Sequence, residues 1–319
     1  MICWPRRLPR ARPKPTFPTC SRCSTNWRDR CVMADPVPTV GLFGLGLIGS
    51  AVARRLCAAG FPVVGHDPDA SRCAELAGLG GRAGAPRDVW QSDVVFSCVF
   101  DTGQLAELIR TAPDCRAVLV SVSTCDPDQM PGLAGQAAAK GITLIEAPVS
   151  GTSRALAEGT ALLILAGDPG AADRIAPVLD AVAMARRHVG PIGNGNRAKL
   201  AINLVLGLNR AALAEGLVFA EKLGLDAERF LDLARASAAQ SAVMDSKGAK
   251  MARREFSPQG RIAQSAKDFT LILDGAAAAG QGLPFARTYL QMMQAALAAG
   301  EGDLDNAAVL LPISRSRPE

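Results

Sequence analysis

A glycine-rich turn near the start of the chain constrains its fold more than any other sequence feature. The segment Gly44–Gly49, which reads GLGLIG, follows a short apolar stretch at residues 39–43 and precedes a helical pattern ending at Gly60. A second apolar stretch, residues 61–65, leads to Asp67, 18 residues after Gly49. A G-x-G-x-x-G pattern alone is weakly specific. Between a strand and a helix, with an acid closing the next strand, it predicts a dinucleotide-binding β-α-β unit.

Each glycine of the turn has a separate physical task in such a unit. Gly44 permits the tight turn, Gly46 lets a pyrophosphate approach the backbone, and Gly49 lets the helix pack closely on the strand. The helix N-terminus favours the negative charge of the phosphates. We therefore expect Leu45, Leu47 and Ile48 to lie against the cofactor as well, since they belong to the same turn.

The residues after the second strand indicate which cofactor the unit binds. Asp67 is placed to accept hydrogen bonds from the adenosine ribose, and its carboxylate would repel a 2′-phosphate. Pro68 follows where an arginine could have held that phosphate. The prediction is NAD, with NADP kept as the alternative because Arg72 lies one helical turn further on.

The remaining pattern divides the chain into two structural classes. Strand-like and helix-like segments alternate up to about residue 190, which predicts a parallel sheet covered on both faces. After Gly195 only helical periodicity remains, beginning with a long run at residues 198–223. The prediction is an α/β fold, with a Rossmann-type parallel-sheet domain at residues 39–197 followed by an all-α domain at residues 198–319, joined by the long helix. The expected strands are residues 39–43, 61–65, 93–100, 117–122, 143–147, 161–166 and 187–189, and the expected helices are residues 50–59, 70–78, 102–110, 127–140, 171–181, 198–223, 227–238, 240–252, 263–279 and 285–299.

Composition matters mainly for what it excludes. No run of 18 or more apolar residues occurs, so we expect no membrane span. The net charge of +5 comes from the first 32 residues, whose eight basic residues face one acid and leave the rest slightly acidic. The body therefore has no bulk electrostatic reason to bind nucleic acid. Scattered cysteines, odd in number, indicate reduced thiols and a cytoplasmic protein.

The first 38 residues are foreign to the body in composition. They are rich in Pro, Arg and Cys and show no helical or strand period. A zinc knuckle at Cys20 and Cys23 lacks a second ligand pair, and a targeting peptide is disfavoured by the many prolines. We favour disorder, or an upstream extension of a start codon at Met33, and we predict no metal site.

Several short motifs then occur in an order similar to that of the β-hydroxyacid dehydrogenases, the 3-hydroxyisobutyrate dehydrogenase-like family. The resemblance is collinear over about residues 39–310 and departs from the family pattern at Ile48 (usually Met), Ser121 (usually Asp) and Thr152 (usually Gly). The segments that carry it are Gly44–Gly49, Ser121–Thr124 with Pro127, Glu146–Gly151, Gly159-Thr160, Gly193–Asn203, Lys267-Asp268 and Gly302–Asp305.

Lys199 and Asn203 are the candidate catalytic pair. They are four residues apart in an expected helix and so share one face, among Ala, Leu, Ile and Val. Partial desolvation and the positive charge of an oxidised nicotinamide would both lower the lysine pKa. The family resemblance implies that Lys199 exchanges the substrate's hydroxyl proton and that Asn203 orients the substrate or the lysine.

The resemblance also implies the remaining contacts. Ser150, Gly151 and Thr152 would hold a substrate carboxylate together with Lys199 and Asn203. The side chain of Thr152 should reshape that cradle, which argues against 3-hydroxyisobutyrate itself. Thr124 would lie near the nicotinamide ribose, and Lys267 would reach the cofactor from the helical domain.

The function expected is NAD(P)-dependent oxidation of a small β-hydroxy acid to the semialdehyde or keto acid, or the reverse. An imine reductase shares this architecture but usually lacks the lysine, so Lys199 counts against it. A 6-phosphogluconate dehydrogenase would have His at Ile202 and a longer helical domain. A non-catalytic cofactor-binding relative, tethered to nucleic acid by the basic head, is disfavoured by the Lys199–Asn203 pair. The partners expected are a small carboxylate-bearing substrate and a second copy of the chain, in a homodimer or homotetramer, with no nucleic acid and no membrane.

Overall fold

The computed structural model describes residues 37–317. Its larger sheet has the strand order β3-β2-β1-β4-β5-β6, and every pair of neighbours is parallel. The order reverses direction at β1 and β4, which is where a Rossmann-type sheet binds its ligand. The strands are β1 (Val40–Phe43), β2 (Val63–His66), β3 (Arg82–Ala83), β4 (Val94–Ser97), β5 (Val118–Ser121) and β6 (Thr143–Glu146). Most of the zones expected as strands in this part of the sequence are confirmed, and the short exposed β3 was missed.

The side chains of the central strands alternate between two buried clusters. Val40, Leu42 and Phe96 pack on one face with helix α1, while Phe43 and Val95 pack on the other with α4 and α5. Because helices cover both faces, the central strands are almost entirely apolar, with Ser97 and Ser121 as buried exceptions at the ends of β4 and β5. The helices between these strands are α1 (Leu47–Ala58), α2 (Ala70–Gly78), α3 (Pro86–Val89), α4 (Thr102–Thr111) and α5 (Met130–Ala138).

A second, three-stranded sheet follows, and it corrects the expectation that the later strands extend the first sheet. Its order is β7-β8-β9, with β7 antiparallel to β8. The expected single helix at residues 171–181 is also wrong, because it breaks at Ile175, just before Pro177 in the first turn of the next helix. The elements are β7 (Val149–Ser150), α6 (Ser153–Ala157), β8 (Leu162–Leu165), α7 (Pro169–Arg174), α8 (Ala176–Val182) and β9 (Ala185–His188).

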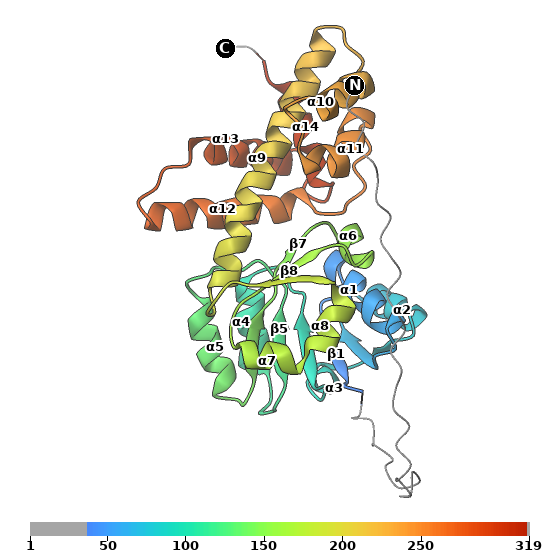
Figure 1. The fold of residues 1–319 in the computed structure, drawn as a ribbon, viewed down its shortest axis with the longest axis vertical. Coiled ribbons are helices and arrows are strands. Elements are labelled where there is room, and N and C mark those ends of the chain that lie inside the picture. Colours follow the sequence, from blue (N-terminus) through green and yellow to red (C-terminus); the bar gives the residue numbers. More distant parts are fainter. Residues whose placement is uncertain (1–36, 318–319) are drawn as a thin grey trace, which may run out of the picture. The chain divides into compact units, whose positions relative to one another are not determined.

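The rest of the described chain is helical, as expected. Helix α9 (Asn194–Lys222) runs from the sheets into the other helices (Figure 1) and begins one turn earlier than the sequence predicted. The expected helix at residues 240–252 contains a π-helical turn, η1 (Met244–Gly248), which was not foreseen. The other elements are α10 (Ala227–Ala236), α11 (Ala249–Arg253), α12 (Ile262–Ala278), α13 (Pro284–Ala298), the 3-10 turn η2 (Asn306–Val309) and α14 (Leu310–Arg315).

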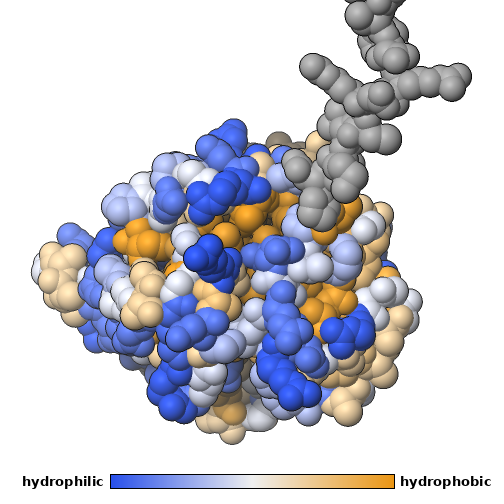
Figure 2. Space-filling view, turned by 90° about the horizontal axis from the view of Figure 1, so that it is seen from below, coloured by the Kyte–Doolittle hydropathy of each residue, from blue (hydrophilic) through white to orange (hydrophobic). Residues whose placement is uncertain are grey.

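By length and composition alone, α9 could cross a membrane, and 22% of its most apolar window is buried inside the protein. The core helix of a soluble protein passes the same test, so the expectation of no membrane span stays a prediction. Hydrophobic residues also show in patches among hydrophilic ones on the face drawn in Figure 2. The expectation for residues 1–38 lies almost wholly outside the described residues.

Candidate functional site

The glycine turn lies at the floor of a groove of about 810 Å³. The groove follows the carboxyl ends of β1, β2 and β4, where an open parallel sheet binds ligands. Gly44, Gly46, Leu47 and Ile48 line it, and Asp67 lies at the end of β2. Leu45 points away from it into the core, with 2% of its surface exposed.

The three glycines of the turn prove unequal. A Cβ on Gly44 would lie 2.6 Å from the Cys98 carbonyl oxygen, and one on Gly49 would overlap the Gly44 carbonyl oxygen. A Cβ on Gly46 would meet nothing closer than Arg72 Nη1 at 3.9 Å. The chain's own packing therefore explains Gly44 and Gly49, whereas the space beside Gly46 is open. A pyrophosphate fits that space, since Gly46 is the N-cap of α1 and no side chain caps the helix N-terminus.

Asp67 is buried, and its carboxylate already has partners inside the chain. The N–H of Leu45 donates to Oδ2 at 2.7 Å and the N–H of Asp69 to Oδ1 at 2.9 Å. Arg72 lies 3.3 Å away and also pairs with Asp69. A carboxylate accepts about four hydrogen bonds, and the two long bonds from Arg72 Nη1, at 3.3 and 3.4 Å, are the ones that ribose hydroxyls would replace.

A second pocket, of about 360 Å³, adjoins this groove. Ile48, Val122, Arg261 and Gln264 line both, so a ligand in one can contact a ligand in the other. Besides Ile48, the smaller pocket gathers six more of the predicted site residues, namely Thr124, Ser150, Gly151, Thr152, Lys199 and Asn203. Residues far apart in the sequence thus lie around one space.

Lys199 projects into this pocket from the second turn of α9, with only 8% of its surface exposed. Burial lowers its pKa to about 8, helped by the positive charges of Arg210 and Lys267 and opposed by the carboxylate of Asp268. No hydrogen bond within the described chain involves its amine. Near neutral pH this lysine can therefore take up and release a proton.

Asn203, one turn further along α9, forms no hydrogen bond with the lysine; its side-chain partner within residues 37–317 is Asp268. Its Nδ2 donates to Asp268 Oδ2 at 2.8 Å, which joins α9 to α12. Asp268 is buried and lines the pocket, although the sequence offered it only as half of a Lys-Asp motif. The arrangement leaves the amide oxygen of Asn203 available to a ligand.

The residues predicted to hold the substrate carboxylate, at the end of β7 and just after it, line this pocket, and their contact with a carboxylate stays a prediction. The Ser150 hydroxyl forms no hydrogen bond within the described residues, and Gly151 has a φ of +144°, which favours glycine. The Thr152 hydroxyl accepts the Ala155 N–H at 3.1 Å and so caps α6. Threonine at this position therefore has a local structural reason.

Lys267 lies beside the site, and it is not part of the lining of either pocket. Its Nζ donates to the Thr124 carbonyl at 2.6 Å and to the Phe100 carbonyl at 3.1 Å. It also pairs with Asp268 at 3.0 Å. Lys267 thus joins α12 to the loops after β4 and β5, and its predicted contact with the cofactor stays a prediction.

A buried carboxylate that the sequence analysis did not single out fixes where α9 begins. The carboxylate of Glu146, at the end of β6, accepts hydrogen bonds from the backbone N–H groups of Asn196, at 3.0 Å, and of Gly193. The Asn196 side chain in turn accepts the Cys125 N–H at 2.8 Å. These bonds hold the first turn of α9, and therefore Lys199, against the strand ends.

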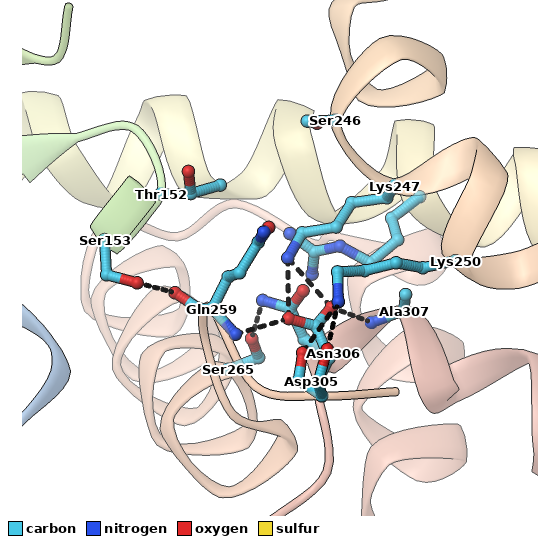
Figure 3. A network of polar contacts seen from close by, with 12 residues as sticks. Thr152, Ser153, Ser246, Lys247, Lys250, Gln259, Ser265, Asp305, Asn306 and Ala307 are labelled. Atoms are coloured by element: carbon cyan, nitrogen blue, oxygen red, sulfur yellow. Dashed lines mark hydrogen bonds and ion pairs between the residues drawn. The ribbon is translucent and has the colours of Figure 1, made fainter. Parts of the chain in front are cut away.

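The helical wall of the pocket contains charged residues that sequence reasoning missed. The π-helical turn η1 brings Lys247 into the wall, where its Nζ lies 2.8 Å from both carboxylate oxygens of Asp305. Asp305 also accepts the N–H groups of Gln259 and Ala307 (Figure 3). Arg210 lines the same wall from α9. In residues 37–317 no cluster of His, Cys, Asp or Glu has the composition of a metal site.

Comparisons with known proteins agree with this geometry. The model of the NAD-binding domain of 6-phosphogluconate dehydrogenase matches residues 39–190. The model described as NAD-binding of NADP-dependent 3-hydroxyisobutyrate dehydrogenase matches residues 193–313. A probable 3-hydroxyisobutyrate dehydrogenase-like protein of Arabidopsis thaliana is 30% identical over 284 residues, covering 86% of this chain and 93% of that protein. The chain belongs to the β-hydroxyacid dehydrogenase family.

Two further relatives support membership in the β-hydroxyacid dehydrogenase family. The 2-hydroxy-3-oxopropionate reductase of Escherichia coli K12 is 30% identical over 283 residues, covering 85% of this chain and 95% of that enzyme. The crystal structure of a 3-hydroxyisobutyrate dehydrogenase from Salmonella typhimurium superposes on this chain with a TM-score of 0.78. The two sequences are 28% identical, and the matched region covers 86% of this chain and 99% of that enzyme. The chain is thus an oxidoreductase of the hydroxyacid dehydrogenase type that uses NAD(P). Bound NAD(P) supplies the acceptor or donor of a hydride, and the groove above Gly46 would hold it.

Proposed function

We propose that this protein oxidises a small β-hydroxy acid to the semialdehyde or keto acid, or catalyses the reverse reduction, with Lys199 as general base and acid. One observation carries the proposal. The buried Lys199, whose pKa is about 8, lies where the cofactor groove adjoins the Ser150–Gly151 loop. A proton carrier is therefore within reach of both ligands.

The side chains divide the chemistry among them. The Ser150 hydroxyl and the backbone at Gly151 bind the substrate carboxylate, and the Asn203 amide oxygen accepts a hydrogen bond from the substrate. In oxidation, neutral Lys199 takes the hydroxyl proton while the carbon gives up hydride. In reduction, the Lys199 ammonium ion returns the proton to the carbonyl oxygen. The apolar walls around Ile48 and Val122 exclude water from the reacting atoms.

NAD is the cofactor that the end of β2 favours. Asp67 and Asp69 both line the groove, and Arg72 pairs with both of them. A 2′-phosphate would lie against the carboxylates of Asp67 and Asp69, which would repel it. The one nearby arginine, Arg72, is already neutralised by these two carboxylates. The ribose hydroxyls of NAD, in contrast, can donate to Asp67.

A panel of substrates tests the proposal. Purified protein is assayed with NAD and with NADP against short β-hydroxy acids, matched α-hydroxy acids and simple alcohols. We expect reduced cofactor to form with β-hydroxy acids, and faster with NAD. The absence of turnover with every hydroxy acid and semialdehyde, while cyclic imines are reduced, would instead support the imine reductase.

Two further expectations join this proposal. Large apolar side chains on α9, Val205 and Phe219, are more than half exposed, which supports a homodimer or homotetramer as the working unit. Light scattering of the purified chain measures this. The five cysteines described are free thiols, which fits a reducing compartment such as the cytoplasm.

A further inference from the structure

Two of the cationic side chains that line the substrate pocket, Lys199 and Arg210, have no carboxylate within ion-pair distance in residues 37–317. Four cationic side chains line the pocket: Lys199, Arg210, Lys247 and Arg261. Lys247 is paired with Asp305 at 2.8 Å, and Arg261 with Asp303 at 3.4 Å. Among residues 37–317, no carboxylate lies within ion-pair distance of Arg210.

Arg210 is held in place by a neutral group. Its Nη1 donates to the hydroxyl of Tyr289 at 2.8 Å, and Tyr289 is itself 2% exposed. A phenol fixes the position of a guanidinium and leaves its charge intact. Arginines elsewhere in the helical region, such as Arg254 and Arg315, are paired with glutamates instead.

Two nitrogen atoms of the Arg210 guanidinium have no hydrogen-bond acceptor in the described chain. Its Nε is buried and forms no hydrogen bond in the structure. Leaving a buried donor unsatisfied costs about 1–3 kcal/mol, and more when the group is charged. The Nη2 of Arg210 also forms no hydrogen bond within residues 37–317 and, unlike Nε, is not fully buried, so this donor remains accessible to an acceptor.

Arg210 also lies on the same face of α9 as the candidate catalytic residues. Lys199, Asn203 and Arg210 follow one another at intervals of four and seven residues, so they share a face of α9. The charge of Arg210 reaches both Lys199 and Lys247, because it lowers the pKa of each of them. The Arg210 guanidinium is therefore close enough to both Lys199 and Lys247 for its charge to act on them.

We propose that Arg210 binds a second carboxylate of the substrate, so that the enzyme acts on a β-hydroxy acid with two carboxylates. This inference rests on the proposed function, in which the Ser150–Gly151 loop binds the first carboxylate. The single positive charge of Arg210 matches one carboxylate better than a doubly charged phosphate. The planar guanidinium can offer a carboxylate two parallel N–H donors.

Binding of the second carboxylate has a consequence for the proton carrier. Because the positive charge of Arg210 lowers the pKa of Lys199, a carboxylate on Arg210 should raise that pKa in the complex. The pH dependence of kcat should then inflect at a higher pH with a diacid than with a matched neutral analogue. An arginine with only a structural role would not produce this difference.

Matched substrate pairs test the inference. We would compare 2-(hydroxymethyl)butanedioate and 2-(hydroxymethyl)pentanedioate with their half-amides, in which a carboxamide replaces the distal carboxylate. The expected kcat/KM of the better diacid is about 10- to 100-fold above that of its half-amide, mainly through KM. In Arg210→Gln this ratio should fall to about one, while Arg210→Lys should keep an intermediate ratio. The exposed Arg229→Gln on α10 is the matched control and should keep the wild-type ratio.

The outcomes separate the inference from the proposed function. Turnover of hydroxy acids with no preference for diacids would overturn the inference alone, and so would a stronger preference for a phosphonate analogue. Equal losses with diacid and half-amide in Arg210→Gln would show a structural role and also overturn it. No turnover of any hydroxy acid by the wild type would defeat the proposed function instead. If Arg210→Gln fails to fold in a thermal melt, the wild-type ratio and Arg210→Lys still decide.

Discussion

The cofactor turn and the helical wall of the substrate pocket are built in opposite ways. The turn is one continuous segment that acts through its backbone, and the positions of Gly44 and Gly49 follow from close contacts inside the chain. The wall joins α9, η1, α12 and η2 through side chains that lie far apart in the sequence. Backbone constraints leave a local pattern in a sequence, whereas charge compensation between distant residues leaves none.

The largest expected effect is a loss of turnover when Lys199, in the substrate pocket, is replaced. Lys199→Met keeps the length of the side chain but removes the proton carrier. We expect turnover to fall by about 10²- to 10⁴-fold while the Kd for NADH changes little, because the lysine does not line the groove. Steady-state rates and a fluorescence titration measure the two quantities. A variant that keeps most of its activity would rule out the assigned role.

Lys199→Met should lose activity but gain free energy of unfolding. The pKa of Lys199 is lowered from 10.5 to about 8, so below pH 8 the folded state bears the full cost of a buried ammonium ion, of order 3 kcal/mol. The unfolded state binds more protons between pH 8 and 10.5, so this cost is relieved as pH rises through that window. Lys199→Met should therefore be the more stable protein at neutral pH, with an advantage that shrinks at high pH. Urea denaturation of both proteins across that range measures it.

Two matched substitutions in the glycine turn separate its role in folding from its role in cofactor binding. Gly49→Ala puts a methyl group against the Gly44 carbonyl, so we expect a loss of unfolding free energy of about 3 kcal/mol or more. Gly46→Ala meets no atom closer than 3.9 Å, so the fold should be retained while cofactor affinity falls. Urea denaturation and NADH titration separate the two effects. If Gly46→Ala bound NADH as tightly as the wild type, the pyrophosphate would not lie there.

A smaller effect is expected at the end of β2. Asp67→Asn keeps an oxygen that can accept the Leu45 N–H but removes the negative charge. The ratio of kcat/KM with NAD to that with NADP should fall by about tenfold, roughly 1.4 kcal/mol. The exposed Asp173→Asn on α7 is the control with the same change in charge and should keep the ratio. If the NAD-to-NADP ratio of kcat/KM were unchanged in Asp67→Asn, Asp67 would not determine which cofactor the enzyme prefers.

The sequence predicted what depends on local pattern. The parallel sheet, the helical second half and the glycine turn all follow from periodicity and turn chemistry. It did not predict the antiparallel strand β7, whose two residues are too short for any alternation to be visible. The π-helical turn at Lys247 was missed because one extra residue in a helical turn leaves the hydrophobic pattern almost unchanged.

The site shows the same division. Lys199, Asn203 and Ser150 could be named because their motifs are contiguous, but the hydrogen bond from Asn203 to Asp268 spans 65 residues. The partner of Arg210, Tyr289, is 79 residues away, and that of Lys247, Asp305, is 58 away. Such pairs are set by helix packing, and no single segment encodes them.

The pH dependence of kcat/KM for hydroxy acid oxidation tests the central claim most directly. Neutral Lys199 is the active form in oxidation, so the rate should rise with pH and level off above its pKa of about 8. In the reverse reduction the ammonium ion is active, and the rate should fall through the same pH. A profile that shows no inflection near pH 8 in either direction would contradict the assignment of Lys199 as the proton carrier.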